Sequence, residues 1–480
     1  MFAARRTLSL LRAPPAGGGC ACAASRRYSA HAPAMVEYLA TSGTTDAFYH
    51  VNLSDIVRQH QRWVDELPRV TPHYAVKCNP DMHVLRTLAD LGCGFDCASV
   101  TEMDALLDLD VAPDRIVYAN PCKAPSELEH AHARGVGLTV FDSVEELRKL
   151  ATVMPEAQLL LRIRPDDSRS ICQFGMKYGA GLDEVPELLR TAADLSLTVS
   201  GVCFHVGSGC YAAEAYSDAV SLSRAAFDMG ADQGFAFNML DIGGGMPGEL
   251  FAPETPALNG ASPPAEDKEE AKAPPSFEAI AKVSREALDR DFPAGSGVAL
   301  IAEPGRYFVH ASHTLATQVI GLKADTYSEQ GGTSYYINDG VYGSFNCLLY
   351  DHAEVTPHVL QRANSAVENE TQETCSIWGP TCDGLDCVKQ SASLPSLAVG
   401  DWLYWPGMGA YTGAASSSFN GFAPPRAQYY YDGKPLASMV LEDLEAAGVV
   451  GGGVGAGGGP GLGLPTLEEQ EHKQAAAQLV

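Results

Sequence analysis

Residues 73–120 decide the fold, with the sequence HYAVKCNPDMHVLRTLADLGCGFDCASVTEMDALLDLDVAPDRIVYAN. Three short runs rich in β-branched and aromatic residues, at 73–78, 94–98 and 116–120, alternate in it with longer stretches of helical period. This alternation is typical of parallel strands joined by crossover helices. The stretch therefore predicts the start of an α/β fold built on a parallel sheet.

The same alternation continues to His310. Five further strand-like runs lie at 138–141, 158–164, 197–205, 238–242 and 298–302. Helical patterns, such as those at 144–153 and 211–229, separate the runs. Eight strand–helix units are what a TIM (β/α)8 barrel requires, so we expect such a barrel over residues 54–312.

The segments outside the barrel pattern differ in composition. Strand-like runs at 314–322, 333–338, 374–378 and 402–405, with turns such as Asn338-Asp339-Gly340 between them, predict a β-rich sandwich or barrel-like domain over 313–445. Residues 37–53 are expected to add an N-terminal strand region to it. Residues 251–276, rich in Pro, Ala, Glu and Lys, predict a flexible insertion in the barrel, and the Gly-rich residues 446–480 predict a disordered tail.

The first 36 residues are rich in Arg, Ala and Ser and contain no acidic residue before Glu37. Organellar transit peptides have this composition, and the segment Arg26–Ser29 resembles a mitochondrial processing site. A disordered tail, with Met35 as the effective start, explains the same composition. Both interpretations stay open.

The composition excludes several classes of partner. A formal net charge of −26 repels nucleic acid and anionic lipid and favours cationic small molecules, although it serves solubility equally well. The 13 cysteines show neither zinc-ligand spacing nor a disulfide framework. No apolar run approaches the roughly 20 residues that span a bilayer. We therefore expect no bound metal, no nucleic acid partner and no membrane attachment.

Barrel enzymes place their catalytic groups at the C-terminal ends of the strands. Residues that can take part in catalysis or ligand binding occupy those positions here: Lys77, Asp96, Arg162, His205, Ser208, Asp241, Gly243, Gly244, Gly245 and Glu303. Each alone is commonplace, and a glycine loop after a strand is a weak signal. A lysine nucleophile, a glycine loop for a phosphate, an aromatic histidine and a carboxylate on one face together indicate a pyridoxal-phosphate site.

Longer blocks of sequence carry a family resemblance. They are YAVKCN at 74–79, HVGSG at 205–209, GGG at 243–245, EPGR at 303–306, NDGVYGSFNC at 338–347, LYDH at 349–352, GPTCDGLD at 379–386, MGAYT at 408–412 and FNGF at 419–422. Over roughly Val36 to Glu442 the chain resembles the barrel-fold (fold type III) pyridoxal-phosphate-dependent decarboxylases of basic amino acids, specifically the eukaryotic group that acts on ornithine. The resemblance implies a barrel like that of alanine racemase and a C-terminal β domain.

The resemblance also implies a role for each cofactor residue. Lys77 would hold pyridoxal 5'-phosphate covalently, Glu303 would pair with the pyridine nitrogen, and His205 would stack on the ring. The phosphate would lie against Ser208, Gly243, Gly244, Gly245, Gly305, Arg306 and Tyr411. Asp96 and Arg162 would support Lys77 and the cofactor.

The implied reaction converts L-ornithine to putrescine and CO2, the first step of polyamine biosynthesis. Asp351 and Asp383 would hold the distal ammonium of the substrate. Tyr350, Tyr342 and Phe419 would complete the substrate site. Cys382 would protonate the α-carbon from across the interface of a head-to-tail homodimer whose active sites are shared.

Several alternatives stay open. The same chemistry could act on lysine, arginine or diaminopimelate. A regulatory pseudoenzyme of the antizyme-inhibitor kind would show damage at Lys77, Asp96, Arg162, Tyr342 or Cys382, and all five are present. Antizyme itself is a candidate partner. The resemblance implies a cytoplasmic location, whereas the Arg-rich N-terminus points to a mitochondrion or plastid.

Overall fold

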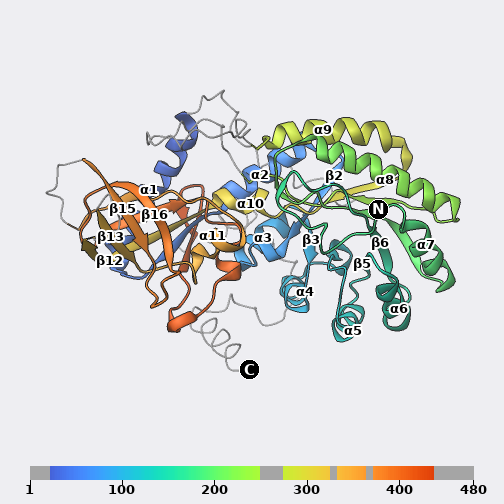
Figure 1. The fold of residues 1–480 in the computed structure, drawn as a ribbon, viewed down its shortest axis with the longest axis horizontal. Coiled ribbons are helices and arrows are strands. Elements are labelled where there is room, and N and C mark those ends of the chain that lie inside the picture. Colours follow the sequence, from blue (N-terminus) through green and yellow to red (C-terminus); the bar gives the residue numbers. More distant parts are fainter. Residues whose placement is uncertain (1–21, 249–273, 325–331, 364–370, 437–480) are drawn as a thin grey trace, which may run out of the picture.

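The computed structural model describes the whole chain except residues 1–21, 249–273, 325–331, 364–370 and 437–480. A helix-covered barrel and a β-rich part lie side by side (Figure 1). The tail expected at 446–480, and all but the last three residues of the insertion expected at 251–276, fall outside the described residues.

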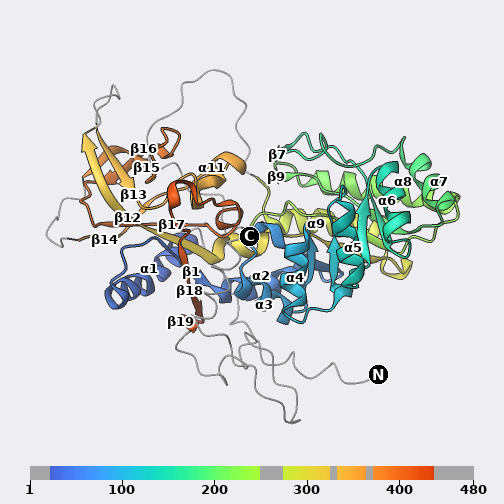
Figure 2. The same ribbon diagram turned by 90° about the horizontal axis from the view of Figure 1, so that it is seen from below.

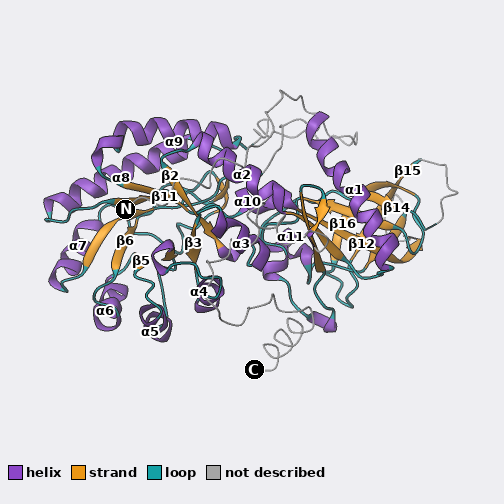
Figure 3. Cartoon of the chain, turned by 180° about the vertical axis from the view of Figure 1, so that it is seen from behind, coloured by secondary structure: helices purple, strands orange, loops and turns teal. Residues whose placement is uncertain are grey.

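Eight strands close into a parallel barrel, which confirms the expected TIM-like fold. They are β2 (Val70–Ala75), β3 (Gly94–Cys97), β4 (Ile116–Tyr118), β5 (Leu138–Phe141), β6 (Gln158–Arg162), β8 (Thr198–Cys203), β10 (Met239–Asp241) and β11 (Ala299–Ala302). The helices outside the barrel are α2 (Leu53–Glu66), α3 (Met82–Asp90), α4 (Val100–Leu107), α5 (Pro125–Ala133), α6 (Val144–Val153), α7 (Val185–Asp194), α8 (Glu214–Asp232), α9 (Phe277–Asp291) and α10 (Arg306–Val309). Figure 3 shows them as a layer around the strands.

The barrel interior is apolar at mid-height and polar at its mouth. The apolar cluster consists of Val117, Val140, Leu160, Cys203 and Ile301. Arg162 and Asp241 are both register partners of Cys203 on neighbouring strands, so their side chains face the same interior. Because these two residues end β6 and β10, charged groups line the C-terminal mouth of the barrel.

Helix α2 shows how the outer layer fixes a strand. The Asn52 side chain caps the helix by accepting the Ser54 N–H at 3.2 Å. Trp63, fully buried, donates its indole N–H to the Val70 carbonyl at 2.8 Å. Replacing such a buried tryptophan by alanine typically costs about 3–5 kcal/mol. The helix thereby anchors β2, the strand that leads to Lys77.

The β-rich part is a nine-stranded sheet. Its strands are β1 (Phe48–Asn52), β12 (His313–Ala324), β13 (Thr333–Ile337), β14 (His358–Gln361), β15 (Gln372–Trp378), β16 (Cys387–Pro395), β17 (Trp402–Pro406), β18 (Arg426–Tyr431) and β19 (Lys434–Pro435). Strand β1 pairs antiparallel with β12 and parallel with β18. The N-terminal strand β1 thus lies beside β18, which is close to the C-terminal end of the described chain.

The segment Asn338-Asp339-Gly340 follows β13 as a turn, but it does not connect two neighbouring antiparallel strands. The Asp339 carboxylate accepts N–H groups from Gly340 at 2.7 Å and Ser344 at 3.1 Å. The chain then enters the short helix α11 (Cys347–Tyr350), and β13 finds its parallel partner in β15. The turn therefore leads to α11, which precedes Asp351.

The N-terminal region contains less strand and more helix than expected. Helix α1 (Cys22–Ser42) occupies the first part of the strand region predicted over 37–53. Within residues 1–36 it also replaces the part of the predicted disordered tail that begins at Cys22. Met35 and Leu39 are buried against the sheet, where they pack near Trp402. This burial, which local sequence does not reveal, stabilises the helix.

Two short strands, β7 (Ser170–Cys172) and β9 (Ser208–Cys210), pair antiparallel beside the barrel. Figure 2 shows them at the same edge of the molecule as α11.

In the part of the chain that is described, no helix combines the length and apolar character that crossing a membrane requires.

Candidate active site

Lys77 lies at the barrel mouth in the turn that follows β2. Its Nζ donates to Oδ2 of Asp96 on the neighbouring strand β3, where Asp96 is the register partner of Ala75. Asp96 is 1% exposed, whereas 46% of the Lys77 side chain is accessible. Burial lowers the Lys77 pKa, but the carboxylates of Asp96 and Glu303 raise it above its usual value overall. Lys77 is therefore a reachable ammonium group held by a buried anion.

The β-rich part holds the Lys77 turn in place. The Tyr411 N–H donates to the Cys78 carbonyl at 2.9 Å, and Asn79 donates its side-chain amide to the Gly409 carbonyl at 3.0 Å. Tyr411 adopts a φ of 55°, a left-handed conformation that is uncommon for a bulky residue. Backbone strain of this kind is concentrated at functional sites.

His205 follows β8 and presents a neutral ring. Its Nδ1 accepts the Gly207 N–H at 3.0 Å, so the ring proton is assigned to Nε2. Burial, followed by the positive charges of Arg162 and Lys77, lowers the His205 pKa well below its usual value. The Phe174 ring meets the His205 ring edge to face, with centroids 4.9 Å apart. A neutral, braced imidazole suits stacking on another ring.

The loop Gly243–Gly245 after β10 tolerates no side chain. Gly243 and Gly245 have φ angles of 65° and 89°. A Cβ atom on Gly243 would lie 2.1 Å from the Phe204 carbonyl oxygen, and one on Gly245 would lie 2.3 Å from that of Gly207. Among the described residues, the N–H groups of Gly244 and Gly245 have no backbone acceptor. Such a loop can cradle an anion.

Arg306 begins α10 and contacts both the Asp351 carboxylate and the Tyr411 ring. Its Nη2 donates to the Asp351 carboxylate oxygens at 2.5 and 2.7 Å. Its guanidinium lies over the Tyr411 ring, 5.2 Å from the centroid. The structure therefore places the expected phosphate ligands Arg306 and Tyr411 together and adds Asp351, an expected substrate ligand, to them.

Glu303 follows β11 and faces other acids. Burial, then the charges of Asp241 and Asp96, raise the Glu303 pKa well above its usual value, although Lys77 and Arg162 oppose the shift. Burial also raises the pKa of Asp241 to about 6. A carboxyl group that retains a proton in this way can make a hydrogen bond to a heterocyclic nitrogen.

These residues fit a pyridoxal-phosphate cofactor. Lys77 supplies the amine, and the glycine loop, Ser208 and Arg306 supply donors for a phosphate dianion. The neutral His205 ring suits the flat face of a pyridine ring, and the Glu303 carboxyl suits the pyridine nitrogen. Gly305 lies against the Lys77 turn, since a Cβ atom there would be 2.9 Å from Cβ of Cys78.

The remaining expected residues form a second group in the β-rich part. The Tyr342 hydroxyl donates to Asp383, and the Tyr342 ring stacks on Phe419 with centroids 4.3 Å apart. The Cys382 N–H donates to the Asn420 side chain at 3.2 Å. Within the described ranges, no hydrogen bond or ion pair joins this group to Lys77. One chain thus carries two groups of site residues.

Large apolar side chains are exposed around the second group. Tyr350 and Leu385 are each 72% exposed, and Phe419 and Phe422 are also solvent-accessible. Cys382 itself is exposed. An exposed apolar patch around chemically important residues is typical of a binding surface.

Sequence reasoning missed two aromatic residues at the mouth. Phe174 packs on His205, and the Tyr178 ring lies 5.2 Å from the Arg162 guanidinium. Both lie in the segment that follows β7. An aromatic residue in a loop at the C-terminal end of a barrel strand is a signal that could have found them.

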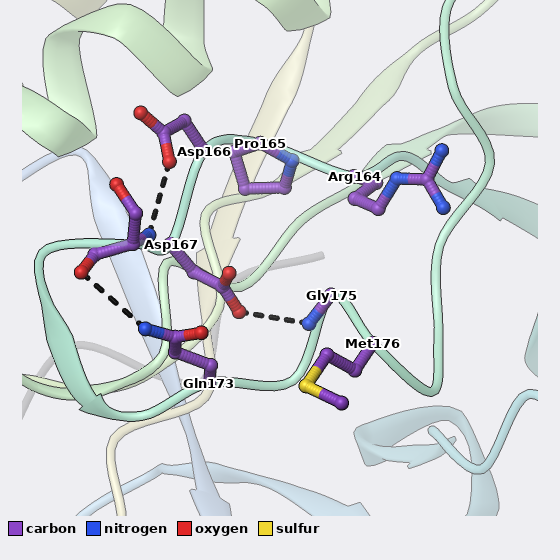
Figure 4. A pocket seen from close by; sticks show the side chains of 8 residues that line it. Arg164, Pro165, Asp166, Asp167, Gln173, Gly175 and Met176 are labelled. Carbon is purple, nitrogen blue, oxygen red and sulfur yellow. Dashed lines mark hydrogen bonds between the residues drawn. The ribbon is translucent and has the colours of Figure 1, made fainter.

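The segments on either side of β7 also enclose a surface hollow of about 430 Å³ (Figure 4). The Asp167 carboxylate organises it, because Oδ2 accepts the N–H groups of Phe174 at 2.5 Å and Gly175 at 2.7 Å. Arg164 and Met176 form other parts of the wall. Asp167 thus fixes the backbone from which the Phe174 ring reaches His205.

Comparisons with known proteins agree with this geometry. Residues 53–310 match the family described as "Pyridoxal-dependent decarboxylase, pyridoxal binding domain". The chain is 46% identical to ornithine decarboxylase of Rattus norvegicus over 405 residues, 82% of each protein. It is equally 46% identical to antizyme inhibitor 2 of Xenopus laevis over 392 residues, covering 80% of this chain and 81% of that protein. The crystal structure of the Paramecium bursaria Chlorella virus arginine decarboxylase superposes with a TM-score of 0.74 at 34% identity, covering 83% of this chain and all of that one.

Proposed function

The chain belongs to the family of pyridoxal-dependent decarboxylases, and we propose that within it the chain converts L-ornithine to putrescine and CO2. The observation that carries the proposal is the position of Asp351. Its carboxylate lies beside Arg306, at the phosphate end of a site that begins at Lys77. A basic amino acid bound through the cofactor beside Lys77 would find an anion there for its distal ammonium.

The cofactor, when bound, supplies a sink for the electron pair that remains on the α-carbon after CO2 leaves. The residues of the protein position the cofactor and the substrate and supply protons to them. Lys77 would hold the cofactor through its amine, and Asp96 keeps that amine in place. His205 would cover one ring face, and Glu303 would hold a proton at the ring nitrogen. Arg306, Tyr411, Ser208, Gly305 and the Gly243–Gly245 loop would bind the phosphate.

The substrate residues fix chain length and product. Asp351 and Asp383 hold the distal ammonium, with Tyr350, Tyr342 and Phe419 beside them. Cys382 gives its Sγ proton to the α-carbon. A missing or extra methylene typically changes the transition-state energy by about 1–3 kcal/mol, so this arrangement separates ornithine from its longer relatives.

A substrate panel tests the proposal. Purified protein with pyridoxal phosphate is given ornithine, lysine, arginine or diaminopimelate separately, and the release of CO2 and amine is measured. We expect ornithine to have the highest kcat/KM. If lysine or arginine exceeds it, the reaction class stands and the substrate assignment fails.

The similarity to antizyme inhibitor 2 makes a regulatory pseudoenzyme the second candidate. The Lys77–Asp96 pair opposes it, because a chain without cofactor chemistry has no use for a reachable lysine held by a buried carboxylate. The absorption spectrum after addition of pyridoxal phosphate separates the two. A lysine-bound cofactor gives a visible band, whereas a pseudoenzyme gives only the spectrum of the free compound.

We further propose a head-to-tail homodimer with shared active sites. The exposed apolar residues around Cys382, including Tyr350 and Leu385, support it. So does the separation of the site residues into a Lys77 group and a Tyr342–Asp383 group. Antizyme binding stays a prediction.

For the location, we propose the cytoplasm, with a mitochondrion or plastid as the alternative. Family resemblance supports the first and the acid-free N-terminus supports the second. Met35 and Leu39 are packed into the β-rich part, so any cleavage compatible with this structure lies before them. Fusing residues 1–36 to a fluorescent protein distinguishes the alternatives, because only a transit peptide directs the fusion to an organelle.

A further inference from the structure

Asp241 connects the two ends of the candidate cofactor site. This fully buried residue ends β10, and its Oδ1 accepts the Gly243 N–H at 2.9 Å. The Gly243 carbonyl in turn accepts the Glu303 N–H at 2.8 Å. One aspartate therefore holds the first glycine of the phosphate loop, and that glycine holds the backbone of Glu303.

The charges around Asp241 do not balance when all acids are ionised. The acids are Asp96, Asp241 and Glu303, and the bases are Lys77 and Arg162. The other titratable neighbours are Cys203, on the adjacent strand, and His205, whose ring is neutral. Three carboxylates against two cations leave one negative charge in a largely buried cluster, where an uncompensated charge is unfavourable.

The second oxygen of Asp241 shows where a proton can compensate that charge. Oδ2 is buried and has no donor among the described residues. Asp241 is the register partner of Ile301, which faces the barrel interior. Glu303, two residues after Ile301, lies on the same side and is a neighbour of the Asp241 side chain. Two carboxylates can only accept hydrogen bonds, so they face each other stably when one of them carries a proton.

We infer that Asp241 and Glu303 share one proton and that Glu303 passes this proton to the ring nitrogen of the cofactor. The inference rests on the proposed function for its second half. The O–H bond at Glu303 breaks, an N–H bond forms on the ring, and Glu303 remains as a carboxylate beside the new cation. Asp241 is then a positioning residue, which fixes both Glu303 and the phosphate loop.

The expected pH dependence has a definite sign. Burial raises the Asp241 pKa to about 6, so between pH 4 and 6 the folded protein keeps a proton that the unfolded chain releases. The cofactor-free protein should therefore lose stability as pH rises through this range.

The test compares cofactor-free wild type, Asp241→Asn, Glu303→Gln and the double variant by melting temperature from pH 4 to 8. If the two residues share a proton, each single variant removes the same part of the pH dependence, and the double variant removes no more. Each single variant should also melt higher than wild type at pH 7. Additive changes would mean two independent groups and would overturn the inference. Should Asp241→Asn not fold, Glu303→Gln alone carries the test, since it removes the same proton.

Cofactor affinity gives a second readout. Asp241→Asn should weaken pyridoxal-phosphate binding about tenfold, because the amide oxygen of asparagine accepts the Gly243 N–H more weakly than a carboxylate oxygen does. Asp401→Asn is the matched control, a buried aspartate in the β-rich part whose carboxylate also accepts backbone N–H groups, from Ala363 and Ala398, and it should leave cofactor affinity unchanged. If wild type itself neither binds pyridoxal phosphate nor decarboxylates ornithine, the proposed function fails. If it does both while Asp241→Asn keeps the wild-type pH profile, only this inference fails.

Discussion

Arg306 and Asp351 form an ion pair in which a single guanidinium nitrogen serves both carboxylate oxygens, at 2.5 and 2.7 Å. In the proposed function, Arg306 binds the cofactor phosphate and Asp351 binds the substrate ammonium. A phosphate dianion on Arg306 would weaken its hold on Asp351 and leave that carboxylate more available to a cationic substrate. The two proposed sites would then share a charge.

Asp351→Asn should separate the two roles. The KM for ornithine should rise about tenfold or more, because a hydrogen bond to a charged group contributes about 1.5–3 kcal/mol. The affinity for pyridoxal phosphate should stay unchanged or increase, because Arg306 loses its competing partner. Steady-state kinetics and equilibrium cofactor binding measure the two effects. An equal loss of both affinities would show that the ion pair is needed to hold Arg306 in place.

Phe174→Leu should weaken the cofactor site without unfolding the loop. The edge-to-face pair of Phe174 and His205 is worth about 0.5–1.5 kcal/mol, so we expect a loss of roughly two- to tenfold in pyridoxal-phosphate affinity. Met176→Ala is the control in the same loop, since its side chain is 92% exposed. Equal effects of both substitutions would assign the change to the loop as a whole.

The barrel was predictable because each strand carries its own local signal. Runs such as 138–141 are strand-like by composition, and helical stretches separate them, so the order of elements determines the closed sheet. Helix α1 was not predictable, because its burial depends on Trp402, far away in sequence. Strand β18 was missed for a similar reason, since it is stabilised by parallel pairing with β1.

Site residues were predictable where a motif places them at a strand end, as for Lys77 and Glu303. Their interactions were not. The pairing of Arg306 with Asp351 joins the barrel to α11, and the packing of Phe174 on His205 joins two loops. Such contacts follow from the spatial approach of segments and leave no spacing rule in the sequence.

His50→Phe should make the protein less sensitive to acid. The His50 ring lies between His31 and Tyr430, with centroid separations of 4.8 and 4.2 Å, and burial lowers its pKa to about 3. Because the folded protein resists protonation that the unfolded chain accepts, stability falls as pH drops below about 6.5. By pH 5 this loss is about 2 kcal/mol, at about 1.4 kcal/mol per pH unit. Phenylalanine keeps the stacking and removes the titration, so denaturant unfolding at pH 7 and pH 5 should show a smaller difference. His132→Gln, at an exposed position on α5, is the control.

The proposed sharing of active sites predicts complementation between two inactive chains. Lys77→Ala removes the proposed cofactor lysine, so the visible absorption band should disappear while the fold remains. Cys382→Ala removes the proposed proton donor of the second group. In a mixed dimer, one site receives both defects and the other receives the intact Lys77 of one chain and the intact Cys382 of its partner.

Random mixing makes half of the dimers mixed, so activity should return to about a quarter of the wild-type level. The recovery should depend on subunit exchange, which a denaturation–renaturation step or co-expression provides. It should be absent when the two variant dimers are combined without such exchange. A chain that carries both substitutions is the matched control, because mixing it with either single variant creates no intact site. If exchange is demonstrated by mass-tagged subunits and no activity returns, Lys77 and Cys382 act within one chain. The separation of the two groups in the structure would then have to close by movement of the β-rich part.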